Sequence, residues 1–195
     1  MYGQLVERFD THHWLRYGLF AAMGMLGLLL TFLLPALRGK RAGWLYLTLP
    51  AILLRLAVFP SAPSDDSNRY LWEGRLVSEG ISPYATTAND ASLAPLRDVY
   101  WEGINHKDKR TAYPPLAQLL FALIAQIAYA PWFLKLLIVL ADLAVIAGIV
   151  AILQQRGQAI AWAAFYAYNP LSLVAYAGEA HFDAFFLAAA VWAVW

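Results

Sequence analysis

Long apolar stretches separated by short polar segments form the main pattern of this chain. A helix needs about 20 apolar residues, rising about 1.5 Å each, to cross the roughly 30 Å hydrocarbon core of a bilayer. Five such stretches predict membrane spans, at about 14–37, 43–60, 131–153, 159–177 and 184–195. The fifth is still apolar where the sequence stops, so we expect the N-terminal part of a longer polytopic protein.

The segment 114–130, PPLAQLLFALIAQIAYA, is shorter, carries two glutamines and begins with two prolines. It can either cross the membrane or lie along its surface as an interfacial helix. Loop charge bears on this choice, because Lys and Arg gather in cytoplasmic loops. The basic cluster RGKR at 38–41 puts that turn in the cytoplasm and residues 61–113 outside. We favour the interfacial reading, with an extracytoplasmic loop over 61–130, since it also leaves Arg156 in the cytoplasm.

A polar helix is predicted near the start of this loop, in SDDSNRYLWEGRLVSEG at 64–80. Asp65 or Asp66 can cap its N-terminus, and Gly80 supplies a C-terminal stop. Oppositely charged residues four apart can pair along the helix: Asp65 with Arg69, Arg69 with Glu73, and Arg75 with Glu79. With aromatic residues on another face, the pattern predicts an amphipathic helix suited to the membrane surface. The rest of the loop, 83–113, has little periodicity, which is typical of functional or disordered segments.

Composition supports the membrane assignment. Apolar residues make up 61% of the chain and charged residues 14%, against roughly 45–50% and about 25% in soluble domains. A net charge of +1 with scattered cations gives no basis for nucleic-acid binding. The sequence has no cysteine, so a metal site would need Asp, Glu or His ligands. The predicted fold is therefore an all-α, multi-pass protein of the inner or plasma membrane.

Charged residues near the outer ends of the predicted spans are the first candidates for chemistry. Asp65 and Asp66 stand where a lipid head group meets water, and a carboxylate there can accept a proton from a hydroxyl or help hold a divalent cation. The alternative is a helix cap with a solvated neighbour. Arg69, Arg75 and Arg110 can bind a phosphate through the guanidinium fork, although each can instead be solvated or paired within its helix.

A second acidic cluster, Glu179, His181 and Asp183, lies in GEAHFD before the last apolar stretch. Glu179 and Asp183 are four apart and can share a helical face, where an anion at a helix start is favoured by the helix dipole. The cluster is either functional or a hydrated connector. No helical spacing brings His181 onto the face of the two acids, so the pattern is a weak metal site.

Two charges fall inside predicted spans. Asp142 lies near the middle of 131–153, and Arg55 lies five residues from the outer end of 43–60. An unpaired charge at the bilayer centre costs roughly 2.5 to 3.5 kcal/mol on insertion scales. We therefore predict a structural contact between Arg55 and Asp142.

Three blocks of the sequence resemble a known family. They are SDDSNRYLWEGRLVSEGISPY at 64–84, NHKDKRTAYPPLAQLLFAL at 105–123 and YNPLSLVAYAGEAHFDAFFLAA at 168–189. In this order and spacing they resemble the N-terminal part of a bacterial GT-C superfamily glycosyltransferase, close to the polyprenol-phosphate-sugar-dependent, mannosyltransferase-like proteins. The resemblance implies a membrane enzyme of the cell envelope that moves a hexose from a polyprenyl-phosphate donor to a lipid-linked or cell-surface glycan acceptor, on the extracytoplasmic side.

The resemblance also implies roles for the candidate residues. The first outer loop of that fold carries an essential acid just after a span, so Asp66, a little ahead of Asp65, is expected to act as the base in an inverting transfer. Arg69, Arg75 and Arg110 are expected at the donor phosphate, and Tyr70, Trp72 and Tyr84 are expected to stack on a sugar or seat the helix. Glu179, His181 and Asp183 match a later acidic motif of the superfamily. No cofactor is required, and a divalent metal ion is compatible with this chemistry.

Two other classes of function fit the same features. A transporter or flippase of lipid-linked sugars would use acids and aromatic residues for binding alone, and discontinuous spans in corresponding halves would favour it. The sequence shows no internal repeat. A noncatalytic membrane scaffold would use the loop 61–130 as a docking surface and would need no acid at its outer face.

Overall fold

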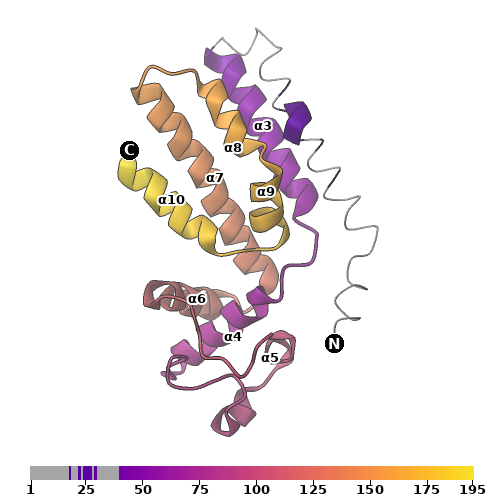
Figure 1. Cartoon of the computed structure of the whole chain (residues 1–195), viewed down its shortest axis with the longest axis vertical. Coiled ribbons are helices and arrows are strands. Elements are labelled where there is room, and N and C mark those ends of the chain that lie inside the picture. The colour runs from indigo at the N-terminus through magenta and orange to yellow at the C-terminus, as the bar shows by residue number, and fades with distance from the viewer. Residues whose placement is uncertain (1–17, 19–21, 23, 28, 30–39) are drawn as a thin grey trace. The chain divides into compact units, whose positions relative to one another are not determined.

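The computed structural model describes residues 18, 22, 24–27, 29 and 40–195, and the regular elements in this part are helical (Figure 1). The chain divides into two compact units. Unit 1 comprises the described residues up to Ser61 together with Val139–Gly178 and Phe182–Trp195. Unit 2 comprises Ala62–Ile138 and Glu179–His181.

Three apolar helices contribute to unit 1. They are α3 (Lys40–Val58), α7 (Pro131–Gln155), whose residues from Val139 onward belong to this unit, and α10 (Asp183–Val194). Helices were predicted at these places, and the structure confirms them as helices. Among the described residues, α7 is the one helix long and apolar enough to cross a membrane, with 25 residues and a mean hydropathy of 2.9 over an 18-residue window. The span predicted at 14–37 lies outside the described residues, apart from seven isolated positions.

The stretch 159–177, predicted as one span, is an interrupted helix. It consists of η3 (Ile160–Ala163), α8 (Ala164–Ala167), α9 (Pro170–Ser172) and the π-helix η4 (Leu173–Gly178). The break falls before Pro170, because proline has no backbone N–H and disfavours helical backbone in the residue before it. The Asn169 side chain caps the new start by accepting a hydrogen bond from Leu171 N at 2.9 Å.

The core of unit 1 joins α3, α7 and α8 through apolar side chains. Its buried members are Leu47, Ala51, Ile146, Val150, Ala163, Ala164, Ala167 and Tyr168. The predicted pairing of Arg55 with Asp142 is confirmed, with Nε 2.6 Å from Oδ2 and both side chains buried. Tyr166 donates to the other carboxylate oxygen at 2.7 Å. The two charges therefore compensate each other inside the helical core, as the cost of an isolated buried charge requires.

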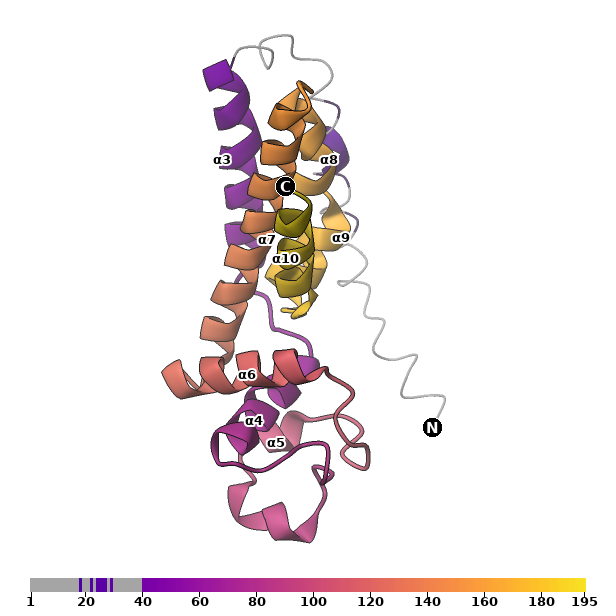
Figure 2. The same ribbon diagram turned by 90° about the vertical axis from the view of Figure 1, so that its left-hand side faces the viewer.

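Unit 2 is built around two short helices, α4 (Asp66–Ser78) and α6 (Pro115–Ile127), which lie against each other (Figure 2). The helix predicted after Asp65 is confirmed, and Gly80 beyond its end has a φ of 77° that suits glycine. At Gly74 the two backbones approach closely: a Cβ there would lie 2.4 Å from the carbonyl oxygen of Phe121. Glycine at this position is what permits the α4 and α6 backbones to touch.

Helix α4 is buried on more than one side. Arg69 and Glu73 are 6% and 2% exposed, while Trp72 and Leu71 are each 1% exposed. The expectation of an amphipathic helix whose aromatic face lies at the membrane surface is therefore wrong for α4, because its aromatic residues are covered within unit 2, as are Arg69 and Glu73 of the charged face. The buried charges are tolerated because they pair with each other and with polar groups of the loop, as described below.

The segment 83–113 is more ordered than its lack of periodicity predicts. It contains the 3-10 helix η2 (Ala91–Leu96) and the short helix α5 (Val99–Gly103). A small apolar core holds it against α4, made of Trp72, Leu76, Ala88, Leu93 and Ile104. Trp101 donates its indole N–H to the Ala88 carbonyl at 2.7 Å. Tryptophan side chains thus supply the packing that a repeating apolar pattern would supply in a longer helix.

Candidate active site

The two adjacent acids, Asp65 and Asp66, stand at the N-terminus of α4 in different surroundings. Asp65 occupies the N-cap position, as predicted, but its side chain makes no capping hydrogen bond. The predicted position is therefore confirmed and the predicted hydrogen bond is not formed. Its exposed carboxylate accepts a hydrogen bond from Asn105 Nδ2 at 2.8 Å. The predicted ion pair between Asp65 and Arg69 is absent from the described structure, because Arg69 turns to Glu73 instead.

Asp66 is 31% exposed and has a polar neighbour at each carboxylate oxygen. Tyr113 donates its hydroxyl to Oδ1 at 3.4 Å, and His181 Nδ1 lies 3.8 Å from Oδ2. Burial raises the pKa of Tyr113, and the nearby Asp66 carboxylate raises it further, so the phenol stays protonated and acts as a donor. Asp66 is thus a partly accessible carboxylate whose orientation is fixed by groups far away in the sequence.

The segment Glu179–His181 reaches this site as a short non-helical loop between η4 and α10. Ser64 donates its backbone N–H to the Glu179 carbonyl at 2.9 Å, which ties the loop beside the start of α4. His181 Nε2 lies 3.2 Å from Glu179 Oε2. The expected helical face shared by Glu179 and Asp183 does not form, because the π-helix η4 ends at Gly178 and α10 begins only at Asp183.

This local backbone changes which members of the second cluster meet. His181 joins Glu179 and Asp66, contrary to the helical-spacing argument that set it apart from the acids. Asp183 belongs to unit 1 instead. No group of three or more His, Asp or Glu side chains among the described residues is arranged to hold a metal ion.

The three candidate arginines differ in accessibility. Arg69 is buried, with Nη1 2.9 Å from Glu73 Oε1 and Nη2 donating to the carbonyls of Asn105 at 2.5 Å and His106 at 3.0 Å. Its guanidinium is therefore occupied by the protein. Arg75 is half-buried, and its hydrogen bond to Glu79 raises its pKa. Arg110 is exposed and forms no ion pair with any residue that the structure describes, so it is the cation most open to a ligand.

The candidate aromatic residues also divide by burial. Tyr70, 2% exposed, stacks on Phe121 with ring centroids 4.7 Å apart. Trp72, 1% exposed, donates its indole N–H to the Leu96 carbonyl at 3.3 Å. Both seat α4 in unit 2, which leaves Tyr84, 39% exposed, as the accessible aromatic candidate. The Tyr84 hydroxyl donates to the Tyr113 carbonyl at 2.6 Å.

Several residues of this site were not identified from the sequence. Gln118 of α6 donates its amide to Glu73 Oε2 at 2.5 Å and to Thr111 Oγ1 at 2.8 Å. Asn105 and Tyr113 hold the acids as described above. A glutamine in the middle of the apolar segment PPLAQLLFALIAQ was the available signal for the first of these, since a buried amide needs polar partners. No local pattern marks the other two.

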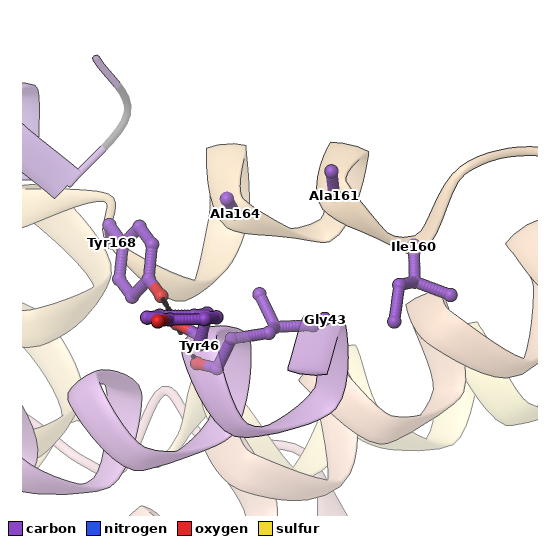
Figure 3. Close-up of a pocket in the computed structure, with 7 residues that line it drawn as sticks. Gly43, Tyr46, Ile160, Ala161, Ala164 and Tyr168 are labelled. Carbon is purple, nitrogen blue, oxygen red and sulfur yellow. Dashed lines mark hydrogen bonds between the residues drawn. The ribbon is translucent and has the colours of Figure 1, made fainter. Parts of the chain in front are cut away.

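A separate shallow pocket lies in unit 1, between the first turns of α3 and the η3–α8 segment (Figure 3). Its lining is apolar apart from tyrosine hydroxyls and comprises Gly43, Tyr46, Leu47, Ile160, Ala161, Ala164 and Tyr168. Tyr168 directs its hydroxyl to the Tyr46 carbonyl across this pocket. Without an acid, a base or a nucleophile in its lining, the pocket offers no group-transfer chemistry, and the carboxylates of unit 2 remain the candidate active site.

Comparison with known proteins adds one finding to this geometry. A family model described as "Alpha-(1->6)-mannopyranosyltransferase, N-terminal domain" matches residues 4–195. Comparison with curated proteins and with solved structures gave no match. The match covers nearly the whole chain and agrees with the resemblance of the three sequence blocks to mannosyltransferase-like GT-C proteins. The chain therefore belongs to the alpha-(1->6)-mannopyranosyltransferase family of glycosyltransferases, and it corresponds to the N-terminal domain of that family.

Proposed function

We propose that the protein transfers a hexose, with mannose the sugar indicated by its family, from a polyprenyl-phosphate donor to a lipid-linked or cell-surface glycan. The observation that carries this proposal is the environment of Asp66. Its carboxylate is partly exposed, contacts Tyr113 and His181 from distant parts of the chain, and stands at a helix start. A positioned but accessible carboxylate is what a general base requires.

In the proposed step, Asp66 accepts the proton of the acceptor hydroxyl. The acceptor oxygen attacks the anomeric carbon of the donor sugar, the bond from that carbon to the phosphate oxygen breaks, and the polyprenyl phosphate leaves with the electron pair. Attack in line with the leaving group inverts the anomeric configuration. Asp65, exposed and bonded to Asn105, has the second role of orienting the acceptor. The step needs no metal ion.

The developing charge on the leaving phosphate calls for cations. Arg110 fits this role best because it is exposed and unpaired within the described structure, and Arg75 is the second choice because Glu79 and Asp98 already contact it. Arg69 is assigned a supporting role instead, since Glu73 and two carbonyls occupy its guanidinium. Tyr84 is the aromatic candidate for a sugar ring.

We also propose that unit 2 lies on the extracytoplasmic side of a multi-pass membrane protein, with α6 at the membrane surface. Its 13 residues rise about 20 Å, less than the roughly 30 Å of a bilayer core. One face of α6 packs inside unit 2, while its other face exposes Leu116, Leu119, Leu123 and Ile127. An amphipathic helix of this kind, too short to cross, suits the membrane interface.

A transfer assay tests the proposed function. Membranes containing the full-length protein are incubated with radiolabelled polyprenyl-phosphate mannose, and the label is followed into products that resist mild acid. Asp66→Asn should lower the rate by about 10²- to 10⁴-fold, the usual contribution of a general base. Asp90→Asn is the matched control, because Asp90 caps η2 elsewhere in the same loop and asparagine caps equally well.

Three results would contradict this proposal. Full transfer activity in both Asp65→Asn and Asp66→Asn would remove the acids from the mechanism. Label that crosses the membrane while it remains attached to polyprenyl phosphate would instead indicate the transporter or flippase reading, and no label movement with partner proteins captured on the loop would indicate a scaffold.

A further inference from the structure

His181 occupies a place that the transfer mechanism has not yet used. Its two ring nitrogens face two different carboxylates: Nδ1 lies 3.8 Å from Asp66 Oδ2, and Nε2 lies 3.2 Å from Glu179 Oε2. The three side chains are each 31% to 39% exposed, so none is part of the buried core. Asp66 and His181 are 115 residues apart in the sequence, and this contact is therefore a product of the fold.

The backbone around His181 is constrained to hold this arrangement. Ser64, next to the two acids, donates its N–H to the Glu179 carbonyl. Ala180, fully buried, has a φ of 63°, a left-handed conformation that is unfavourable for a residue with a Cβ. A strained residue between Glu179 and His181 persists only where the surrounding structure enforces it. Here it turns both side chains toward the start of α4.

The chemistry of imidazole explains what such a bridge does. Which ring nitrogen carries the proton is set by the hydrogen bond that the other nitrogen makes. A neutral ring that donates from Nε2 to Glu179 would face Asp66 with its Nδ1 lone pair, which repels a carboxylate. The imidazolium form donates from Nε2 to Glu179 and turns its Nδ1–H toward Asp66 Oδ2, which at 3.8 Å is in the range of an ion pair and not of a hydrogen bond. In the imidazolium form Glu179 fixes the orientation of the ring, and the charge of the ring attracts the side of the Asp66 carboxylate that faces away from Tyr113.

We propose that His181 is a positioning residue for Asp66, held in place by Glu179. This inference rests on the proposed role of Asp66 as base. It assigns Asp66 a carboxylate–histidine–carboxylate support in which Oδ1 accepts a hydrogen bond from Tyr113 at 3.4 Å and Oδ2 lies within ion-pair range of His181, at 3.8 Å. The remaining lone pairs of the carboxylate then point to where an acceptor hydroxyl can approach, since a carboxylate can accept about four hydrogen bonds.

Transfer kinetics of the full-length protein in membranes test this role. His181→Ala should lower kcat about 10- to 100-fold, which is less than the loss of the base itself would cost. The KM for polyprenyl-phosphate mannose should change less than about threefold. The reason is that removing an interaction made only in the transition state lowers kcat and leaves substrate binding unchanged. Added imidazole should restore part of the rate of His181→Ala and none of the rate of Asp66→Asn. Glu179→Gln should lower kcat in the same direction and by a smaller factor.

The outcomes separate this inference from the proposed function. If the parent protein transfers the label and Asp66→Asn does not, while His181→Ala keeps the parental kcat, the positioning role is overturned and the proposed function stands. If the parent protein transfers no label, the proposed function itself fails. Should His181→Ala not fold, His181→Gln with an unchanged melting temperature takes its place: a lowered kcat supports the role, and a parental kcat overturns it.

Discussion

Two arginine–glutamate pairs on helix α4 allow a direct test of what burial does to an ion pair. Arg69 pairs with Glu73 and Arg75 pairs with Glu79, each four residues apart and each at 2.9 Å. The side chains of the first pair are 7% and 3% exposed, and those of the second are 34% and 39% exposed. Spacing, distance and residue types are the same, whereas burial differs, and Arg75 keeps a second carboxylate partner in Asp98 when Glu79 is changed.

The expected magnitudes are far apart. Removing one partner of a buried pair leaves an uncompensated charge and costs about 3–5 kcal/mol, and the Glu73 carboxylate also accepts the amide of Gln118. An exposed pair contributes about 0–1 kcal/mol. In a domain of about this size, 1 kcal/mol corresponds to about 2–4 °C in melting temperature. Glu73→Gln should therefore lower the melting temperature by about 6–20 °C, and Glu79→Gln by about 4 °C at most.

Thermal unfolding of the detergent-purified protein measures both shifts, with tryptophan fluorescence as the signal. The double variant Arg69→Met/Glu73→Met should lie closer to the parent than Glu73→Gln does, because replacing both members of a buried pair with apolar residues removes the unpaired charge. Equal shifts for the two glutamine variants would refute the reasoning, since they would mean that the Arg69–Glu73 pair is as solvated as the Arg75–Glu79 pair.

Three further predictions concern other contacts. Gly74→Ala should lower the melting temperature, because overpacking against the α6 backbone costs about 1–3 kcal/mol. Gly103→Ala is the control and should cost less, because its Cβ meets the flexible end of the Asn68 side chain. Equal shifts in melting temperature would contradict the close contact between α4 and α6. Exchanging the charges of Arg55 and Asp142 together should recover part of the expression that each single exchange loses, measured by a fluorescent fusion, and no recovery would argue against their pairing. Tyr113→Phe should lower kcat about two- to tenfold, the range of one hydrogen bond, without changing the melting temperature, and an unchanged kcat would remove its hydroxyl from the site.

Local sequence patterns predicted the parts of the fold that depend on local physics. Apolar length and flanking polar residues placed α3, α7 and α10, and Gly80 marked the end of α4. The break at Asn169-Pro170 was readable as well, since proline interrupts a helix, but the apolar stretch around it suggested one continuous span. The cost of an unpaired charge predicted the Arg55–Asp142 contact without any structural information.

The interior of unit 2 could not be predicted in the same way, because it depends on contacts between distant residues. Arg69 and Trp72 have the sequence features of ligand-binding groups in a polar loop, and both are buried. They are buried because α6 packs against α4 and because residues of η2 and α5 form a small core with it. The sequences of η2 and α5 show no periodicity that would predict this core. His181 was set apart from the acids by helical spacing, and the left-handed backbone at Ala180, between η4 and α10, made that spacing irrelevant.

The buried arginine gives α4 a second function besides its own stability. Arg69 donates to the carbonyls of Asn105 and His106, and the Asn105 side chain in turn donates to Asp65. Glu73, which holds Arg69, also receives the amide of Gln118 from α6. The buried Arg69–Glu73 pair therefore connects three parts of unit 2: helix α4, the loop that follows α5, and helix α6. It does so near the N-terminus of α4, where the two acids stand. A charge that resembled a phosphate ligand in the sequence is better explained as the support that keeps the loop beside the carboxylates, and for this reason the proposed function assigns the donor phosphate to the exposed Arg110 rather than to Arg69.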